Sequence, residues 1–127
     1  MENARMPFVE IARKLGVSET AVRKRLQKLE ELGIIKKYTI EVDPRKIGFN
    51  IVALIGIDTT PEAYVKVIDT LKNDDRIVKM YSSSGDHMLL LEVWFRNSEE
   101  MTRFVKCLNN IEGVTRVCPA IIIERLK

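Results

Sequence analysis

The chain has 127 residues, of which 46% are hydrophobic and 31% are charged, and its formal net charge at pH 7 is +3. This length suits one ordinary domain or two very small ones that share a core, and the composition is that of a globular protein. The sequence lacks a long apolar span and a charged-then-apolar leader, which argues against a membrane protein or a secreted one, so we expect a cytoplasmic location.

Positive charge is concentrated in the first third of the chain. Residues 1 to 46 carry 11 Lys and Arg against 7 Asp and Glu, whereas residues 47 to 127 carry 10 against 11. Such an asymmetry is expected when one module meets a polyanion and another module has a different task.

Two helices are predicted in this basic part. The first is indicated by apolar residues at helical spacing, namely Phe8, Ile11, Ala12 and Leu15. Gly16 interrupts the pattern, and Ser18 offers an N-cap hydroxyl for a second helix that runs to about Leu32 and ends at Gly33. Two helices joined by a short glycine turn indicate a helix-turn-helix, in which the second helix can enter the major groove of DNA.

The second helix carries polar and basic side chains suited to DNA. At about 100° per residue, Thr20, Lys24 and Gln27 point away from its apolar seam, Arg23 lies on the flank, and Arg25 lies nearer the seam, where it can reach a phosphate or a carboxylate. The alternative is an amphipathic surface helix with a solvated charged face, and the pattern alone leaves both open. The residues that we expect at DNA are Ser18, Glu19, Thr20, Arg23, Lys24, Arg25, Gln27 and Lys28.

The rest of the chain predicts strands and helices in the order βαββαβ. Strands are expected at 51–59, 76–84, 87–95 and 114–126, with one helix opened by Thr60 and Pro61 and another capped by Ser98. This is the split βαβ, ferredoxin-like arrangement, with both helices on one face of an antiparallel sheet. The strands are apolar on both faces instead of alternating, so we expect a second copy of the chain to cover the open face and form a homodimer.

The stretch YSSSGDHM, residues 81 to 88, is a candidate binding loop. Its hydroxyls, an open backbone N–H at Gly85 and a carboxylate suit the charged groups of a small amino acid, although a tight hairpin explains the same residues as turn chemistry. The candidate effector-binding residues are Ser82, Ser83, Ser84, Gly85, Asp86 and His87.

The signatures of catalysis are missing from this sequence. It shows no nucleophile-base pair, no cluster of metal ligands and no phosphate-binding glycine loop. Cys107 and Cys118 lie in apolar surroundings without a CxxC pair, which favours buried thiols. We therefore expect neither an enzyme nor a bound metal or cofactor.

The stretch LGVSETAVRKRLQKLEELGIIKKYTIEVDPRKIGF resembles the helix-turn-helix and linker of the leucine-responsive regulatory protein/AsnC (Lrp/AsnC) family, and archaeal members in particular. The family pattern is matched by Ser18, Arg25, Leu29-Glu30, Gly33-Ile34-Ile35, Asp43-Pro44 and Ile47-Gly48. The resemblance implies an α+β chain in three parts. These are a partial winged helix-turn-helix in residues 1–37, a linker strand in 38–48, and a βαββαβ effector-binding and oligomerisation domain in 49–127 that dimerises through its sheet.

The resemblance also implies the function and the partners. These are transcription regulation at a pseudopalindromic double-stranded DNA operator, control by a small amino acid, and dimers that assemble into higher oligomers. The family motif TGxYD aligns with Ser84-Gly85-Asp86, but His87 and Met88 stand where Tyr and Asp are usual. Family members also carry a further helix before Phe8, whereas only a short lead-in, Met1 to Met6, stands in that place here. An alternative is therefore an amino-acid sensor or co-regulator that forms hetero-oligomers with full-length relatives and binds little DNA itself.

Overall fold

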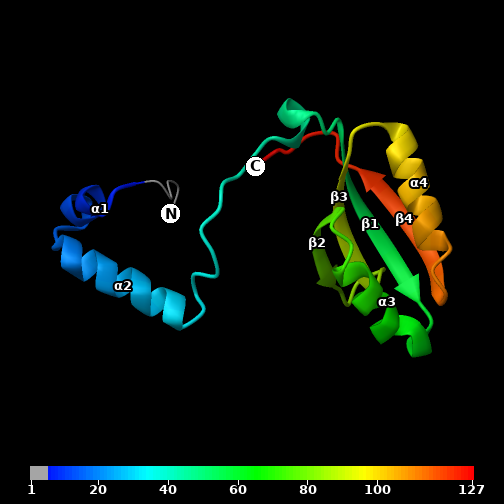
Figure 1. Cartoon of the computed structure of the whole chain (residues 1–127), viewed down its shortest axis with the longest axis horizontal. Coiled ribbons are helices and arrows are strands. Elements are labelled where there is room, and N and C mark those ends of the chain that lie inside the picture. Colours follow the sequence, from blue (N-terminus) through cyan, green and yellow to red (C-terminus); the bar gives the residue numbers. More distant parts are fainter. Residues whose placement is uncertain (1–5) are drawn as a thin grey trace. The chain divides into compact units, whose positions relative to one another are not determined.

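The computed structural model describes residues 6–127, and the chain divides into two compact units, Met1–Val42 and Asp43–Lys127 (Figure 1). The lead-in that stands where family members carry a further helix includes residues 1–5, which lie outside this description. Among the described residues, no helix is both long and apolar enough to cross a membrane.

The first unit is the predicted pair of helices, α1 (Phe8–Leu15) and α2 (Glu19–Glu31). Gly16 ends α1 in the left-handed conformation, with φ of 68°, which a glycine adopts without steric cost. The hydroxyl of Ser18 then caps α2 by accepting a hydrogen bond of 3.1 Å from the N–H of Ala21. The pair closes on a small core made of Ile11, Ala12 and Val22. Leu15 remains 61% exposed.

The expected linker strand at residues 38–48 is not formed. Residues 36–43 have no regular secondary structure, and Pro44–Ile47 form a 3-10 turn that Asp43 caps through the N–H of Arg45. The alternation of Tyr38, Ile40 and Val42 favours an extended chain, but a strand is stable only with a hydrogen-bonded neighbour, which the chain does not supply here.

The second unit confirms the predicted βαββαβ order. Its strands are β1 (Ile51–Thr59), β2 (Ile77–Ser82), β3 (Leu89–Phe95) and β4 (Val114–Ile121), and its helices are α3 (Tyr64–Lys72) and α4 (Ser98–Asn109). The strands form one sheet in the order β2-β3-β1-β4, and each neighbouring pair is antiparallel.

Both helices cover the same face of this sheet. Alternate residues of β1 and β3, such as Ile55 and Leu91, are fully buried and pack with Val67 of α3 and Phe104 of α4 in one core. The opposite face, called the open face below, carries partly or largely exposed apolar side chains between the strands' buried positions. These are Val52, Leu54, Tyr81, Leu90, Trp94 and Ala120.

Two local expectations were wrong. The cap of α4 is Asn97 instead of Ser98, because the Asn97 side chain accepts the N–H of Glu100 at 2.9 Å. The cysteines are not buried either, since Cys107 is exposed on α4 and Cys118 is half-buried on the open face.

The two outer strands of the sheet have features that are typical of edges. On β4, Pro119 lies opposite Ile55 of β1, and proline within a sheet is confined mainly to edge strands because it has no N–H to donate. On β2, Lys79 lies opposite Glu92 and places a charge beside the other edge.

Candidate nucleic-acid interface and effector loop

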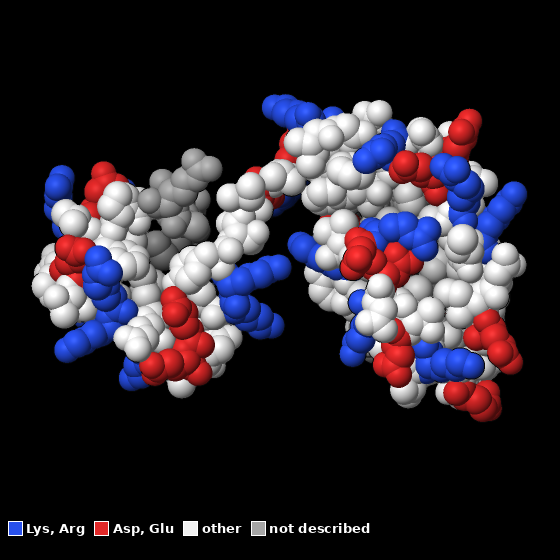
Figure 2. Space-filling model, viewed as in Figure 1, with Lys and Arg blue, Asp and Glu red and all other residues white. Residues whose placement is uncertain are grey.

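The predicted DNA-binding residues lie together on α2, and all except the half-buried Glu19 are exposed. The apolar seam holds the helix against α1 through the buried Val22, which leaves the polar side in solvent. Within residues 6–127, Lys24, Arg25 and Lys28 have no hydrogen-bond or ion-pair partner. Figure 2 shows lysine and arginine side chains spread over this unit among acidic ones. The charge of Lys24, Arg25 and Lys28 is therefore available to neutralise phosphates.

Two of the predicted residues are engaged within the unit. Arg23 forms a 2.7 Å ion pair with Glu19, and its guanidinium lies 4.7 Å from the ring centre of Phe8 on α1. Gln27 donates a hydrogen bond of 3.3 Å to Glu31 one turn later. Both contacts are exposed, so they are weak and can be exchanged for contacts to DNA.

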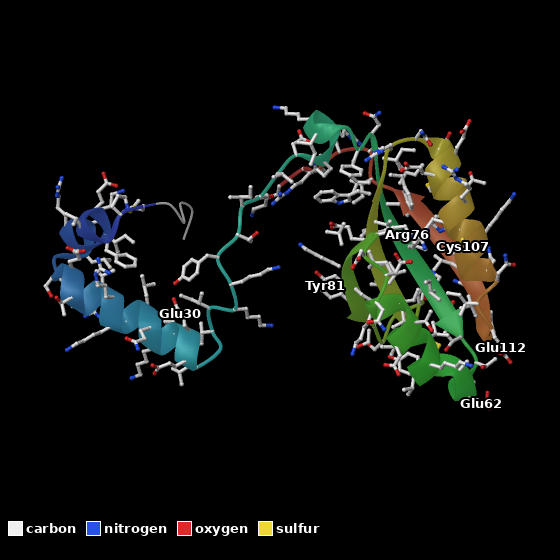
Figure 3. The ribbon with its side chains drawn as sticks, viewed as in Figure 1. Glu30, Glu62, Arg76, Tyr81, Cys107 and Glu112 are labelled. Carbon is white, nitrogen blue, oxygen red and sulfur yellow. The ribbon has the colours of Figure 1, made fainter. Side chains whose placement is uncertain are left out.

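A basic segment just after α2 was not among the predicted site residues. The hydroxyl of Tyr38 donates a 2.6 Å hydrogen bond to Glu30 of α2, which is labelled in Figure 3, and this bond raises the pKa of Tyr38 above its usual value. The bond closes a shallow hollow against the end of α2, lined in part by Lys36 and Lys37. The sequence feature that indicates this basic segment is the pair Lys36-Lys37, directly after Gly33-Ile34-Ile35.

The candidate effector loop is a hairpin that leads from β2 to β3. The N–H of Ser83 donates to the carbonyl of Met88 at 2.9 Å. The N–H of Gly85, which the sequence left open for a ligand, donates instead to the hydroxyl of Ser83 at 3.1 Å. Ser82, Ser84 and Asp86 are exposed. Ser83 and Gly85 thus make a turn, and the side chains of Ser82, Ser84 and Asp86 remain accessible.

His87 folds back from this hairpin onto the open face of the sheet. Its Nδ1 lies 3.1 Å from Oδ2 of Asp58 on β1, and its Nε2 lies 3.4 Å from Nη2 of Arg116 on β4. Arg116 also pairs with Asp58, at 3.3 Å through Nε. The ring rests on Gly56, where a Cβ would overlap with it. Sequence reasoning missed Asp58 and Arg116, because only the strand register brings them to the hairpin.

Asp58 is the acceptor on which this cluster depends. Partial burial opposes the ionisation of its carboxyl, but the hydrogen bonds from His87 and from the Met88 N–H, with the attraction of Arg116, outweigh that effect and lower the pKa of Asp58. The carboxylate therefore closes the hairpin onto β1 and remains ionised at neutral pH.

A second hollow, of about 410 Å³, lies at the start of α3 and β4. Its carboxylates, Glu62 and Glu112, lie at the same end of the unit (Figure 3), with Lys66 beside them. Gly113 approaches Ala63 so closely that no Cβ fits between them. This hollow contains none of the predicted site residues.

Comparison with known proteins assigns a family to both units. Residues 1–30 match the AsnC-type helix-turn-helix domain, and residues 52–127 match the Lrp/AsnC ligand binding domain. Together these matches cover most of the chain, which belongs to the Lrp/AsnC family.

Curated relatives and solved structures agree with this assignment. The chain is 49% identical to the HTH-type transcriptional regulator LrpA of Pyrococcus horikoshii, over 99% of this chain and 90% of the relative. It is 38% identical to LrpA1 of Halobacterium salinarum, over 99% of this chain and 89% of the relative. The structure of E. coli AsnC has the same fold, with a TM-score of 0.89 and 23% identity over 100% of this chain and 87% of that one.

A regulator of Neisseria meningitidis also shares the fold. Its structure, NMB0573 in complex with L-Met, has a TM-score of 0.91 and 21% identity over 99% of this chain and 84% of that one. The present chain is an Lrp/AsnC-type transcriptional regulator, with a DNA-binding helix-turn-helix followed by a ligand-binding domain of ferredoxin-like fold.

Proposed function

We propose that the chain binds a pseudopalindromic operator in double-stranded DNA, with α2 in the major groove. The observation that carries this proposal is the set of exposed cations on α2, of which Lys24, Arg25 and Lys28 have no partner within residues 6–127. Thr20, Arg23, Lys24 and Gln27 lie nearest the bases, and the other cations of the helix neutralise phosphates. The full predicted set also includes Ser18 and Glu19 at the start of the helix.

The same proposal includes a homodimer that pairs through the open face. Leu54 is 44% exposed and Tyr81 is 55% exposed on this face, which is more apolar than a strand surface in water usually is. A two-fold symmetric dimer presents two helix-turn-helix units to two half-sites about one DNA turn apart. The proposal also includes assembly into higher oligomers and mixed assembly with full-length relatives. It further includes a cytoplasmic location and the lack of enzymatic activity.

Control by a small amino acid is supported by the chemistry of the hairpin. Ser82, Ser84 and Asp86 offer hydroxyls and a carboxylate in solvent, and Arg116 adds a half-exposed guanidinium beside His87. A zwitterion needs both a donor group and an acceptor group, and this set supplies them. The L-Met complex of the Neisseria meningitidis regulator supports the same class of ligand.

The alternative function is that of an amino-acid sensor or co-regulator with little DNA binding of its own. The observation that favours it is the small core of the first unit, in which Leu15 and Val9 are largely exposed. A helix-turn-helix that is held by few buried contacts binds DNA more weakly, because part of the binding free energy is used to order it.

DNA binding measured by fluorescence anisotropy, on operators selected from a random pool, tests the proposal. We expect tight binding that weakens steeply with salt. Lys24→Ala should change which operator variants are preferred. Lys36→Ala should weaken all variants alike and reduce the salt slope by about 1. Lys72→Ala, an exposed lysine in the last turn of α3, is the matched control and should change neither quantity.

The outcomes separate the two functions. Binding that is weak and equal for all sequences supports the co-regulator. An equal loss across operator variants for Lys24→Ala makes Lys24 a phosphate contact. The titration is repeated with each common amino acid, and a change in DNA affinity that Asp86→Ala removes supports the effector loop, whereas no change with any of them contradicts it.

A further inference from the structure

His87 lies between two groups of opposite charge, and the chain contains no other histidine. Nδ1 faces the carboxylate of Asp58 at 3.1 Å, and Nε2 faces the guanidinium of Arg116 at 3.4 Å. The side chains of His87 and Asp58 are each only 19% exposed. The ring of His87 packs against the backbone of Gly56, in the space that this residue leaves by having no Cβ.

These contacts fit one tautomer of the neutral imidazole. A guanidinium can only donate, so in this tautomer Nε2 of His87 accepts from Arg116 and Nδ1 carries the proton that is donated to Asp58. A second proton can only be added at Nε2, where it would point at Arg116. The imidazolium therefore keeps the bond to Asp58 and loses the bond to Arg116, since two donors with positive charge then face each other.

The other charges around the ring do not replace the lost contact. Arg116 keeps its ion pair with Asp58 and lies near the thiol of Cys118, at 3.3 Å from Nε, and near the carboxylate of Asp86 in the hairpin. Arg116 therefore remains paired with Asp58 when its contact with the ring is lost. Asp58 is the only carboxylate in direct contact with His87 among the described residues.

The cluster lies on the open face of the sheet. Gly56 and Asp58 have the same strand orientation as Leu54, and Arg116 is paired with Asp58 in the β1–β4 register. Under the two-fold symmetry proposed above, both copies would place this cluster in the interface. Positive charge that is added to the ring there, beside a guanidinium that has lost one of its acceptors, is costly to remove from water.

We propose that His87 is a pH-sensitive latch on the open face. In the neutral form it joins the 83–88 hairpin to β1 and β4, and in the protonated form it releases Arg116 and weakens the pairing of two sheets. The second half of this inference rests on the proposed homodimer. Histidine is the side-chain type whose ordinary charge change lies between about pH 5 and pH 8, so the test below compares pH values near the two ends of that range.

The dimer dissociation constant, measured by sedimentation at pH 8 and at pH 5.5, tests the latch. We expect the wild-type dimer to weaken at least about tenfold at the lower pH. In His87→Gln the amide can donate and accept in place of the imidazole without taking up a proton, so its dimer should change less than about twofold. Gly56→Ala keeps every titratable group but displaces the ring, and it should also lose most of the pH response.

A response of equal size in His87→Gln would overturn the proposal. If the wild type is monomeric at both pH values, the homodimer fails, and the latch is then judged within one chain by NMR. The single histidine gives one set of ring signals, and the Nε–H signal of Arg116 should shift with the same pH midpoint in the wild type. An Arg116 signal that does not follow His87, or that shifts equally in His87→Gln, contradicts the latch without reference to assembly.

Discussion

Asp58 joins three segments that are distant in the sequence. Its carboxylate accepts from the N–H of Met88 at 3.1 Å, faces His87 Nδ1 at 3.1 Å and pairs with Arg116 at 3.3 Å. The register of β1 and β4 also shifts between Asp58 and Thr59. The carboxylate therefore ties down the sheet at the point where its regular pairing is interrupted.

The pKa of Asp58 gives this role a testable dependence on pH. The folded-state pKa lies below the unfolded value of about 3.9, so the ionised carboxylate stabilises the fold above about pH 4, and this contribution is lost as the pH falls through the folded pKa. Asp58→Asn should lower the free energy of unfolding by about 1 to 2 kcal/mol at pH 7 and by less near pH 3, where part of the advantage of the ionised form is lost. Urea unfolding at both pH values measures this.

The control for Asp58 is Asp69→Asn, an exposed carboxylate on α3, which should stay within about 0.5 kcal/mol of the wild type. A cost for Asp58→Asn that is the same at both pH values would mean that the shape of the side chain matters, and not its charge.

Of this cluster, the sequence singled out His87 alone, as a candidate effector-binding residue. Ser83 and Gly85 were candidates beside it because turn residues give a local signal, and the structure places all three in the hairpin, while their binding of an effector stays a prediction. Asp58 and Arg116 had no local signal, since each is a single charged residue in an apolar strand. Their meeting depends on the antiparallel register, which periodicity does not determine.

Helix termini show the same contrast at the scale of elements. Ser18 was predicted as the cap of α2 and accepts the Ala21 N–H, whereas α4 is capped by Asn97, one residue before the predicted Ser98. Both types are good caps, so adjacent candidates are not distinguished by type alone. The element order was nevertheless predictable, because the apolar runs are long and separated by clear turns.

Alanine substitution at the two serines tests these caps. Ser18→Ala should destabilise α2 by about 1 kcal/mol, since the N–H of Ala21 loses its acceptor. Ser98→Ala is the matched control and should cost little, because its hydroxyl caps nothing. Hydrogen exchange of the first amides of each helix measures both effects. Faster exchange at the start of α4 in Ser98→Ala would restore Ser98 as the cap.

At the scale of the whole molecule, the apolar open face of the sheet is the feature that a single copy of the chain leaves uncovered. A single copy leaves Leu54 44% and Tyr81 55% exposed on this face, whereas Ile55 and Leu91 on the other face are fully buried. The missing linker strand has a similar cause, since Ile40 is 67% exposed with no strand beside it. In both places the cover of an apolar side chain depends on a neighbour that local sequence patterns do not specify.

A charge placed on the open face tests its pairing. Leu54→Glu should weaken the proposed dimer by at least about 100-fold, because a carboxylate would be buried in the contact. Val65→Glu on α3, which is 67% exposed on the other side of the sheet, should leave it unchanged. Sedimentation at micromolar concentration measures both. A dimer that tolerates Leu54→Glu pairs by another surface.

Pro119 on β4 affects what happens when many copies are present at high concentration. A sheet that pairs by its face but has a free edge risks templated growth, in which further strands add edge to edge and end in fibrils. Pro119 interrupts the row of donors on β4, and the lysine of β2 charges the opposite edge. In the proposed homodimer, newly synthesised copies would therefore meet through their apolar faces while strand addition at the edges is disfavoured. The same sheet would then be adhesive in one direction and protected from aggregation in the other.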